Sequence, residues 1–180
     1  MVVRTARNAL LIIADENQFP PAVFLAHRLA ALKGDRDVDV VIASESRSDL
    51  AKARELGGPF QLLDVTGLYA DLALPAVNYF TRATYLSLFV PALLQDRYQR
   101  LLYLDVDTYP ESDRVFALFD LDLGRQAIAA VRDLTVAFHP NIFNVEEITE
   151  TLQVAPPRAL GAKYLNSGVL LMDLRAWRRQ

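Results

Sequence analysis

One stretch decides the fold of this chain: Leu101-Leu102-Tyr103-Leu104-Asp105-Val106-Asp107-Thr108-Tyr109-Pro110. A run of apolar residues with strand character ends in two carboxylates one residue apart, and the pattern then breaks at Pro110. Because alternate residues of a strand face the same side, we expect Asp105 and Asp107 to lie side by side, with Val106 turned into the core. Ligands of open α/β sheets bind at the carboxyl ends of strands, so this pair is a candidate functional site.

Two neighbouring carboxylates favour a cation between them. Without one, each carboxylate raises the proton affinity of the other. Hard oxygen ligands of this kind suit Mg²⁺ or Mn²⁺. The alternative is a surface turn whose acidic side chains face water, since Asp-x-Asp pairs also occur by chance. The surrounding sequence has to decide between the two.

Length and composition indicate a folded protein with a sizeable core. The 180 residues are 52% hydrophobic, with a mean hydropathy of +0.15, and we expect residues 1–180 to form a single domain. The net charge of −3 argues against a nucleic-acid partner, which needs a clustered basic face. The absence of cysteine excludes disulfides and thiolate metal sites. No apolar run is long enough to span a bilayer, so we expect no transmembrane segment and a cytoplasmic protein.

Short apolar runs alternate with amphipathic ones along the chain. This alternation predicts βα units and a mostly parallel central sheet flanked by helices, as in a Rossmann-like α/β fold. Pro91 is expected to bend or restart a helix that begins at Thr81, and Asp173 is expected to start a final helix. The polar segment 135–157 is expected to be a loop. The pattern predicts strands at about 9–14, 38–43, 60–65, 101–105, 127–131 and 169–172, and further helices at 22–33 and 48–56.

Polar side chains also follow the first predicted strand. Asp15 and Asn17 emerge where a Rossmann-like sheet holds a base or a ribose. No Gly-x-Gly-x-x-Gly motif follows this strand, and the chain has no Walker-type loop, which argues against NAD-type and P-loop phosphate sites. A nucleotide whose phosphates are held by a metal remains open. Asp15 and Asn17 are equally explained as turn residues.

A third candidate precedes the apolar run 169–172. Asn166-Ser167-Gly168 combines small residues, which permit a close backbone approach, with an amide and a hydroxyl that can bond to sugar hydroxyl groups. The alternative is a turn that leads into a strand.

Taken in order, these motifs resemble family 8 retaining glycosyltransferases, which have the GT-A fold. The likeness extends over nearly the whole chain, and the stretch from Asn166 to Trp177 is its most specific part. The residues that carry it are Ala14-Asp15-Glu16-Asn17, Thr81-Arg82-Ala83-Thr84-Tyr85, Val90-Pro91-Ala92-Leu93-Leu94, Leu102-Tyr103-Leu104-Asp105-Val106-Asp107, Phe119-Asp120-Leu121-Asp122-Leu123-Gly124, Ala129-Ala130-Val131-Arg132-Asp133 and Asn166-Ser167-Gly168-Val169-Leu170-Leu171-Met172-Asp173-Leu174 with Trp177.

This resemblance implies a metal-dependent transferase. Such an enzyme moves a hexose from a UDP-sugar to a saccharide or glycoconjugate acceptor and retains the anomeric configuration. Asp105 and Asp107 would bind Mn²⁺ or Mg²⁺ across the two phosphates of the donor. No catalytic residue can be identified from the resemblance. It implies contacts with the uracil for Asp15, Asn17 and the Ile13 backbone, contacts with the donor sugar for Asp133, Asn166 and Ser167, and a donor-side position for Val106.

The chain also departs from the family pattern. Ser87 stands where many members carry an arginine, for which Arg82 or Arg132 could substitute. The sequence stops at Gln180, before the histidine and lysine motifs that follow in the family. We therefore expect the nucleotide-sugar-binding portion of an enzyme, with an exposed sheet edge and a tendency to self-associate.

Two alternatives from other classes remain open. One is a non-catalytic nucleotide-sugar-binding protein or an inactive fragment. The other is a phosphatase of the haloacid dehalogenase type, which also places Asp-x-Asp after an apolar strand. That motif requires threonine or valine where this chain has Tyr109, and it normally follows the first strand.

Overall fold

A single six-stranded sheet organises the described part of the chain. The computed structural model describes residues 7–68, 70, 85–133 and 165–179. The strands are β1 (Asn8–Ala14), β2 (Val38–Ser44), β3 (Gln61–Asp64), β4 (Arg100–Leu104), β5 (Ile128–Arg132) and β6 (Leu165–Asp173), in the spatial order β3-β2-β1-β4-β6-β5. Strands β1 to β4 pair in parallel, and β6 runs antiparallel between β4 and β5. The α/β class with a mostly parallel sheet is thus confirmed.

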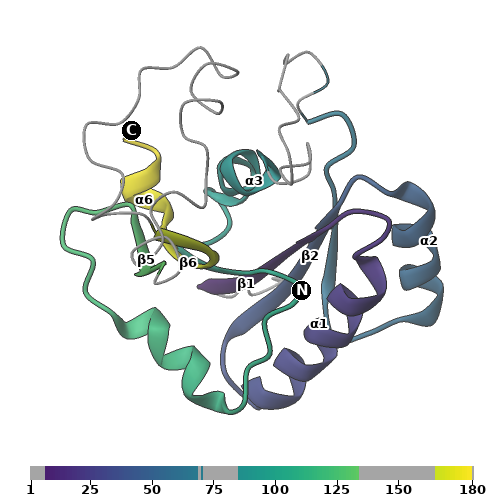
Figure 1. Cartoon of the computed structure of the whole chain (residues 1–180), viewed down its shortest axis with the longest axis horizontal. Coiled ribbons are helices and arrows are strands. Elements are labelled where there is room, and N and C mark those ends of the chain that lie inside the picture. Colours follow the sequence, from purple (N-terminus) through teal and green to yellow (C-terminus); the bar gives the residue numbers. More distant parts are fainter. Residues whose placement is uncertain (1–6, 69, 71–84, 134–164, 180) are drawn as a thin grey trace, which may run out of the picture.

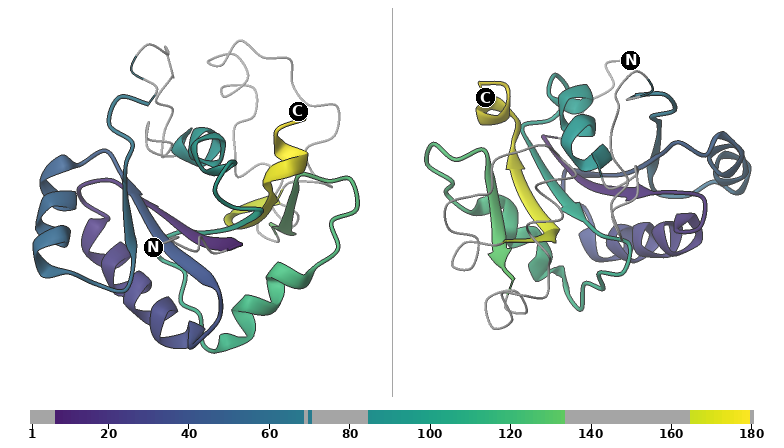
Figure 2. Two further views of the ribbon diagram at one scale, coloured as in Figure 1. Left: turned by 180° about the vertical axis from the view of Figure 1, so that it is seen from behind. Right: turned by 45° about the horizontal axis from the view of Figure 1, so that its top comes forward.

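Helices cover both faces of this sheet (Figures 1 and 2). The helix α3 (Leu86–Leu94) lies on one face, and α1 (Phe19–Lys33) and the 3-10 helix η2 (Asp113–Asp120) lie on the other. The helix α2 (Arg47–Leu56) packs beside β3, and the short helix α6 (Leu174–Trp177) follows β6 directly. The architecture is therefore three-layered around the central strands.

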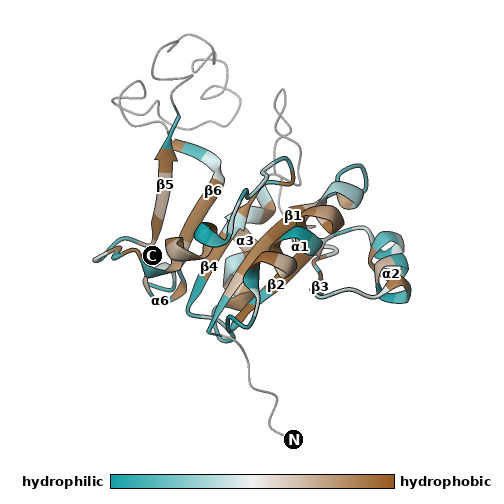
Figure 3. Ribbon diagram, turned by 90° about the horizontal axis from the view of Figure 1, so that it is seen from below, coloured by the Kyte–Doolittle hydropathy of each residue, from teal (hydrophilic) through white to brown (hydrophobic). Residues whose placement is uncertain are grey.

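Alternation along the strands explains the two core clusters. In β1, Leu10 and Ile12 face α1, whereas Leu11 and Ile13 face α3, and all four are buried. A strand that is covered on both faces is apolar on both faces, and the central strands are hydrophobic over most of their length (Figure 3). Replacing a fully buried leucine such as Leu102 with alanine should therefore cost about 2–5 kcal/mol.

Helix boundaries follow local chemistry. The helix α1 begins at Phe19 rather than at position 22, because Pro20 and Pro21 fit its first turn, where backbone N–H groups have no helical partner. In α2, Ser46 caps the first turn by accepting a hydrogen bond from the Asp49 N–H. Pro91 lies inside α3, which runs on to Leu94 and is not restarted there.

Several expectations differ from the structure or fall outside it. The 3-10 helix η2, capped by Ser112, was not expected from the sequence. The expected helix start at Thr81 and the expected loop at 135–157 lie outside the described residues. Asp173 does cap the final helix, since its Oδ1 accepts hydrogen bonds of 3.0 Å from the backbone N–H groups of Arg175 and Ala176.

The expected exposed edge is present at β5. Among the described strands, β5 is the last at this side of the sheet and, together with the start of β6, it exposes apolar side chains. Ile128, Val131 and Leu165 are 37%, 61% and 50% exposed. Unpaired strand edges with apolar side chains are surfaces on which further chain can dock, so self-association remains a prediction.

Candidate active site

The carboxyl ends of β1 and β4 meet at one edge of the sheet. These strands are parallel, and Leu11 pairs with Tyr103. Asp15 and Asp107 each lie four residues beyond that pair, so both leave the sheet at the same edge. The antiparallel strand β6 begins at this edge with Leu165 and Asn166, and β5 ends there just before Asp133. The structure therefore brings together elements that are far apart in the sequence.

Asp105 is held by both its side chain and its backbone. Its Oδ1 accepts a hydrogen bond from the Tyr103 hydroxyl. Its backbone N–H donates to the carbonyl oxygen of Gly168, at 2.9 Å. A Cβ atom at position 168 would lie only 3.0 Å from Asp105 Oδ2. Gly168 thus leaves the space that the carboxylate occupies.

The surroundings of Asp105 disfavour its negative charge. Burial raises the pKa of the Asp105 carboxyl, and the nearby charge of Asp107 raises it further. The hydrogen bond from Tyr103 acts in the opposite direction but does not cancel these effects. Burial likewise raises the pKa of the Tyr103 hydroxyl, which therefore stays protonated and remains a donor. A cation beside the two carboxylates would relieve this penalty.

The carboxylates of Asp105 and Asp107 fit a hard divalent ion whose other ligands come from substrate phosphates and water. Within residues 7–68, 70, 85–133 and 165–179, no group of three or more His, Cys, Asp or Glu side chains is placed to hold a metal. Magnesium is commonly held by one or two carboxylates together with substrate phosphates and water. Asp105 and Asp107 match that donor set.

We expected strand alternation to place Asp105 and Asp107 on the same face, and this expectation is wrong. The strand β4 ends at Leu104, and Asp105 to Thr108 form a turn closed by a 3.0 Å hydrogen bond from the Thr108 N–H to the Asp105 carbonyl oxygen. The turn, rather than strand alternation, sets the positions of Asp105 and Asp107. Val106 does pack against the core on the α1 side, as expected, so a contact of this residue with a ligand would come from its backbone.

At the end of β1, the two candidate residues differ in role. Asp15 is engaged locally, because its Oδ1 accepts hydrogen bonds of 2.9 Å from the N–H groups of Asn17 and Gln18. This is turn chemistry, which the sequence left open as an alternative. Asn17 is exposed, whereas the Ile13 side chain is buried and only its backbone can face a ligand.

Asn166 and Ser167 lie within β6 and not in a turn before it. Both are exposed, and Asn166 Oδ1 accepts a 2.8 Å hydrogen bond from the Gly168 N–H. A register shift between Ala130 and Val131 interrupts the pairing of β5 with this part of β6. Such a bulge changes the direction of side chains near the end of a strand. A Cβ atom at position 168 would lie 3.1 Å from Asn166 Oδ1, so Asn166 shares with Asp105 the space left by Gly168.

Two further candidates lie at the end of β5. Asp133 is half-buried directly after β5, and Arg132 is exposed at the end of that strand. Arg82 lies outside the described residues. Tyr103 was not expected to be a site residue, although its position two residues before Asp105 signals a shared face.

A comparison with family models decides the classification. The model of Glycosyl transferase family 8 matches residues 27–180, which is most of the chain. The chain belongs to glycosyl transferase family 8. The matched range includes the Asp105, Asp107 and Asn166 positions and begins within α1, after Asp15 and Asn17.

Two curated relatives of this family 8 chain match over part of their length. General stress protein A of Bacillus subtilis (strain 168) is 29% identical over 128 residues, which are 70% of this chain and 39% of that protein. Lipopolysaccharide 1,2-glucosyltransferase of Escherichia coli (strain K12) is 35% identical over 106 residues, which are 58% of this chain and 28% of that protein. The chain therefore matches less than half the length of either relative.

Solved structures confirm the GT-A glycosyltransferase fold. An active-site mutant of LgtC has a TM-score of 0.70 at 24% identity, covering 96% of this chain and 59% of that one. The bifunctional glycosyltransferase WbbM has a TM-score of 0.71 at 18% identity, covering 99% of this chain and 33% of that one. In the described part of the chain, no helix is long and apolar enough to cross a membrane.

Proposed function

We propose that this family 8 chain binds a UDP-sugar together with Mn²⁺ or Mg²⁺ and transfers the hexose to a saccharide or glycoconjugate acceptor with retention of configuration. The arrangement of Asp105 supports this proposal most strongly, because the Tyr103 hydroxyl holds its carboxylate and the Gly168 carbonyl oxygen holds its backbone N–H, with Asp107 two residues on. The relative named lipopolysaccharide 1,2-glucosyltransferase, and LgtC, described as a galactosyltransferase in complex with donor and acceptor sugar analogues, support a sugar donor and a sugar acceptor.

Each candidate residue has a role in this proposal. Asp105 and Asp107 hold the ion against the donor diphosphate. Asp15 and Asn17, at the end of β1, face the uracil together with the Ile13 backbone. The other donor contacts are Asp133, Asn166 and Ser167 on the sugar, and the Val106 backbone beside the diphosphate.

The polar groups of the site suit these roles. Asn166 Oδ1 is engaged by the Gly168 N–H, which leaves its Nδ2 to donate to a sugar hydroxyl. Cleavage of the bond between the anomeric carbon and the phosphate leaves negative charge on UDP, and a bound divalent ion would supply the positive charge that stabilises it. Asp105 needs little reorganisation, since its carboxylate is already oriented by Tyr103.

We further propose that residues 1–180 form one domain of GT-A type. One continuous sheet contains every described strand, which supports this proposal. The cytoplasmic location stays a prediction from the sequence.

Nucleotide selectivity tests the donor assignment. UDP, GDP and ADP are titrated into the protein with Mn²⁺ by calorimetry, and UDP is expected to bind most tightly. Asn17→Ala should lower UDP affinity about 5-fold, since it removes one hydrogen-bonding side chain at an exposed position. Equal affinity for UDP and GDP would contradict the uracil assignment.

Turnover separates the transferase from a non-catalytic binding protein. UDP release and the anomeric configuration of the product are followed by NMR with UDP-glucose and UDP-galactose, in this chain and in the complete natural gene product. Transfer with retention supports the proposal. Intact UDP binding without turnover in the complete product would favour a nucleotide-sugar-binding protein. Membership of family 8 leaves the phosphatase alternative without support.

A further inference from the structure

Three arginines surround a pocket near the junction of β6 and α6. The pocket has a volume of about 460 Å³. Its lining combines the turn before β5 with the start and end of α6. The lining residues are Gly124, Arg125, Asp173, Arg175, Ala176 and Arg179.

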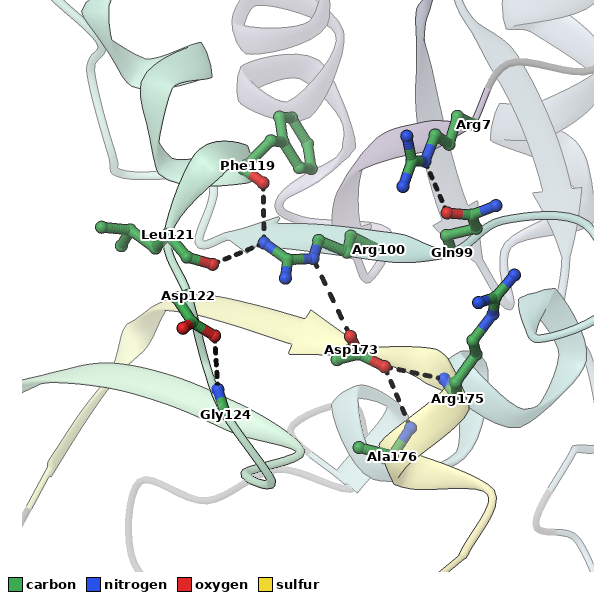
Figure 4. Close-up of polar contacts among 10 residues, drawn as sticks. All are labelled: Arg7, Gln99, Arg100, Phe119, Leu121, Asp122, Gly124, Asp173, Arg175 and Ala176. Atoms are coloured by element: carbon green, nitrogen blue, oxygen red, sulfur yellow. Dashed lines mark hydrogen bonds and ion pairs between the residues drawn. The ribbon is translucent and has the colours of Figure 1, made fainter.

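Asp173, the one carboxylate among the lining residues, already has other partners. Asp173 Oδ1 accepts hydrogen bonds from the backbone N–H groups of Arg175 and Ala176, and Oδ2 lies 3.9 Å from Arg100 Nε (Figure 4). Arg100 is itself held by the carbonyl oxygens of Phe119 and Leu121, at 2.7 and 2.6 Å. Asp173 therefore does not neutralise the arginines of the pocket.

Among the described residues, the three arginines form no ion pair with a carboxylate. Within the described part of the chain, the guanidinium groups of Arg125, Arg175 and Arg179 pair with no carboxylate, whereas their neighbour Arg178 pairs with Asp96. The whole chain has a net charge of −3, so this concentration of positive charge is local. Guanidinium groups bind phosphate oxygens through paired hydrogen bonds.

The pocket is separate from the candidate active site. Arg100 and Asp173 pair at the beginning of β4, and Asp105 follows the end of that strand. Asp105 is five residue steps along the chain from Arg100, which in an extended strand is a distance of about 16 Å. A ligand in the pocket would therefore not occupy the site of the donor diphosphate.

We propose that Arg125, Arg175 and Arg179 form a second anion site, which binds a phosphate-bearing group. The volume lies within the range of about 300–1,000 Å³ of small-molecule sites and exceeds what a single inorganic ion fills. The phosphate group can belong to a free phosphorylated compound or to a phospholipid headgroup. The proposal does not depend on the donor assignment, because it uses other residues, which lie near the amino end of β4, whereas the candidate active site lies at its carboxyl end.

Titration of inorganic pyrophosphate tests the site directly. Calorimetry is done at low salt, with chelator and without divalent ions, because pyrophosphate itself binds Mn²⁺ and the proposed active site needs that ion to hold a diphosphate. The variants are Arg125→Ala, Arg175→Ala, Arg179→Ala and the triple variant. Each single change should weaken binding about 3- to 5-fold, and the triple change about 30-fold or more, since an exposed charge pair contributes up to about 1 kcal/mol.

A matched control removes the same charge elsewhere. Lys52→Ala, Arg54→Ala and Arg114→Ala together delete three exposed cations that do not line this pocket. This control triple variant should bind pyrophosphate as the native protein does. Circular dichroism and melting temperatures verify that both triple variants are folded.

A second arm identifies the source of the phosphate group. Flotation is measured with vesicles of neutral phosphatidylcholine alone and with one-fifth phosphatidic acid. Loss of vesicle binding in the pocket triple variant, but not in the control, assigns the site to a lipid headgroup. The same pattern with pyrophosphate alone assigns it to a free phosphorylated compound. The proposal is overturned if the native protein binds neither probe, or if the pocket triple variant binds both as the native protein does.

Discussion

Gly168→Ala should weaken metal-dependent nucleotide binding without unfolding the protein. The added Cβ would lie 3.0 Å from Asp105 Oδ2 and 3.1 Å from Asn166 Oδ1. Ordinary contact begins at 3.4 Å, so these oxygens must give way by a few tenths of an ångström. Metal sites hold ligand distances to within about 0.2 Å, so this displacement exceeds what the ion tolerates. We expect a loss of about 10-fold or more in affinity for UDP with Mn²⁺.

The stability of this variant should change little. Gly168 is not in the left-handed region of the backbone, and alanine is favoured over glycine inside a strand by about 0.5–1 kcal/mol. That gain offsets part of the crowding. We therefore expect a melting temperature within about 3 °C of the native value.

Gly34→Ala is the matched control, with the opposite outcome. Gly34 ends α1 with φ +54°, and a Cβ there would meet nothing within 4 Å. The backbone there, with φ +54° and ψ −133°, is strained for alanine, so the change should cost about 1–3 kcal/mol and leave UDP binding unchanged. Calorimetric titration with Mn²⁺, and again with chelator, measures both variants alongside thermal melts. If Gly168→Ala binds UDP with Mn²⁺ as tightly as the native protein, the account of the Asp105 carboxylate is refuted.

Three further predictions concern the same edge and the exposed strand. Tyr103→Phe removes the hydroxyl that donates to Asp105, so metal-dependent UDP affinity should fall about 10-fold and stability by about 1 kcal/mol, and unchanged calorimetric affinity would contradict this. Asp105→Asn should raise the melting temperature of the metal-free protein at pH 7. The raised pKa of Asp105 means that its contribution to stability is complete below the unfolded value of 3.8 and is lost as pH rises through the folded value. The rise in melting temperature of Asp105→Asn over the native protein should therefore shrink at acidic pH. A rise that became larger at acidic pH would contradict this prediction. Val131→Lys, on the exposed edge strand β5, should reduce self-association in a concentration series of light scattering, and a strictly monomeric native protein would refute that idea.

The hydrophobic pattern of the sequence predicts most of the fold. The apolar runs at 9–14 and 40–43 predict strands buried on both faces, and the helix between them predicts parallel pairing. Helix starts were less predictable, because Pro20 and Pro21 are compatible both with a loop and with a first turn. The helix η2 was missed, since short 3-10 segments have no strong periodicity.

The candidate site could be predicted by residue type but not by geometry. Asp105, Asp107 and Asn166 were identified from their motifs, whereas the support of Asp105 by Gly168 depends on the pairing of β4 with β6. That pairing joins segments more than sixty residues apart, which local pattern does not specify. Tyr103 was overlooked because a buried aromatic residue in a strand is ordinarily a core residue.

The central claim is that Asp105 and Asp107 hold a divalent ion against a nucleotide diphosphate. The most direct measurement is a calorimetric titration of UDP into the native protein with Mn²⁺ and with chelator, repeated with Asp107→Asn. Asp107 is exposed, so this variant should fold normally. We predict tight binding only for the native protein with Mn²⁺. Equal UDP affinity with Mn²⁺ and with chelator would contradict the claim.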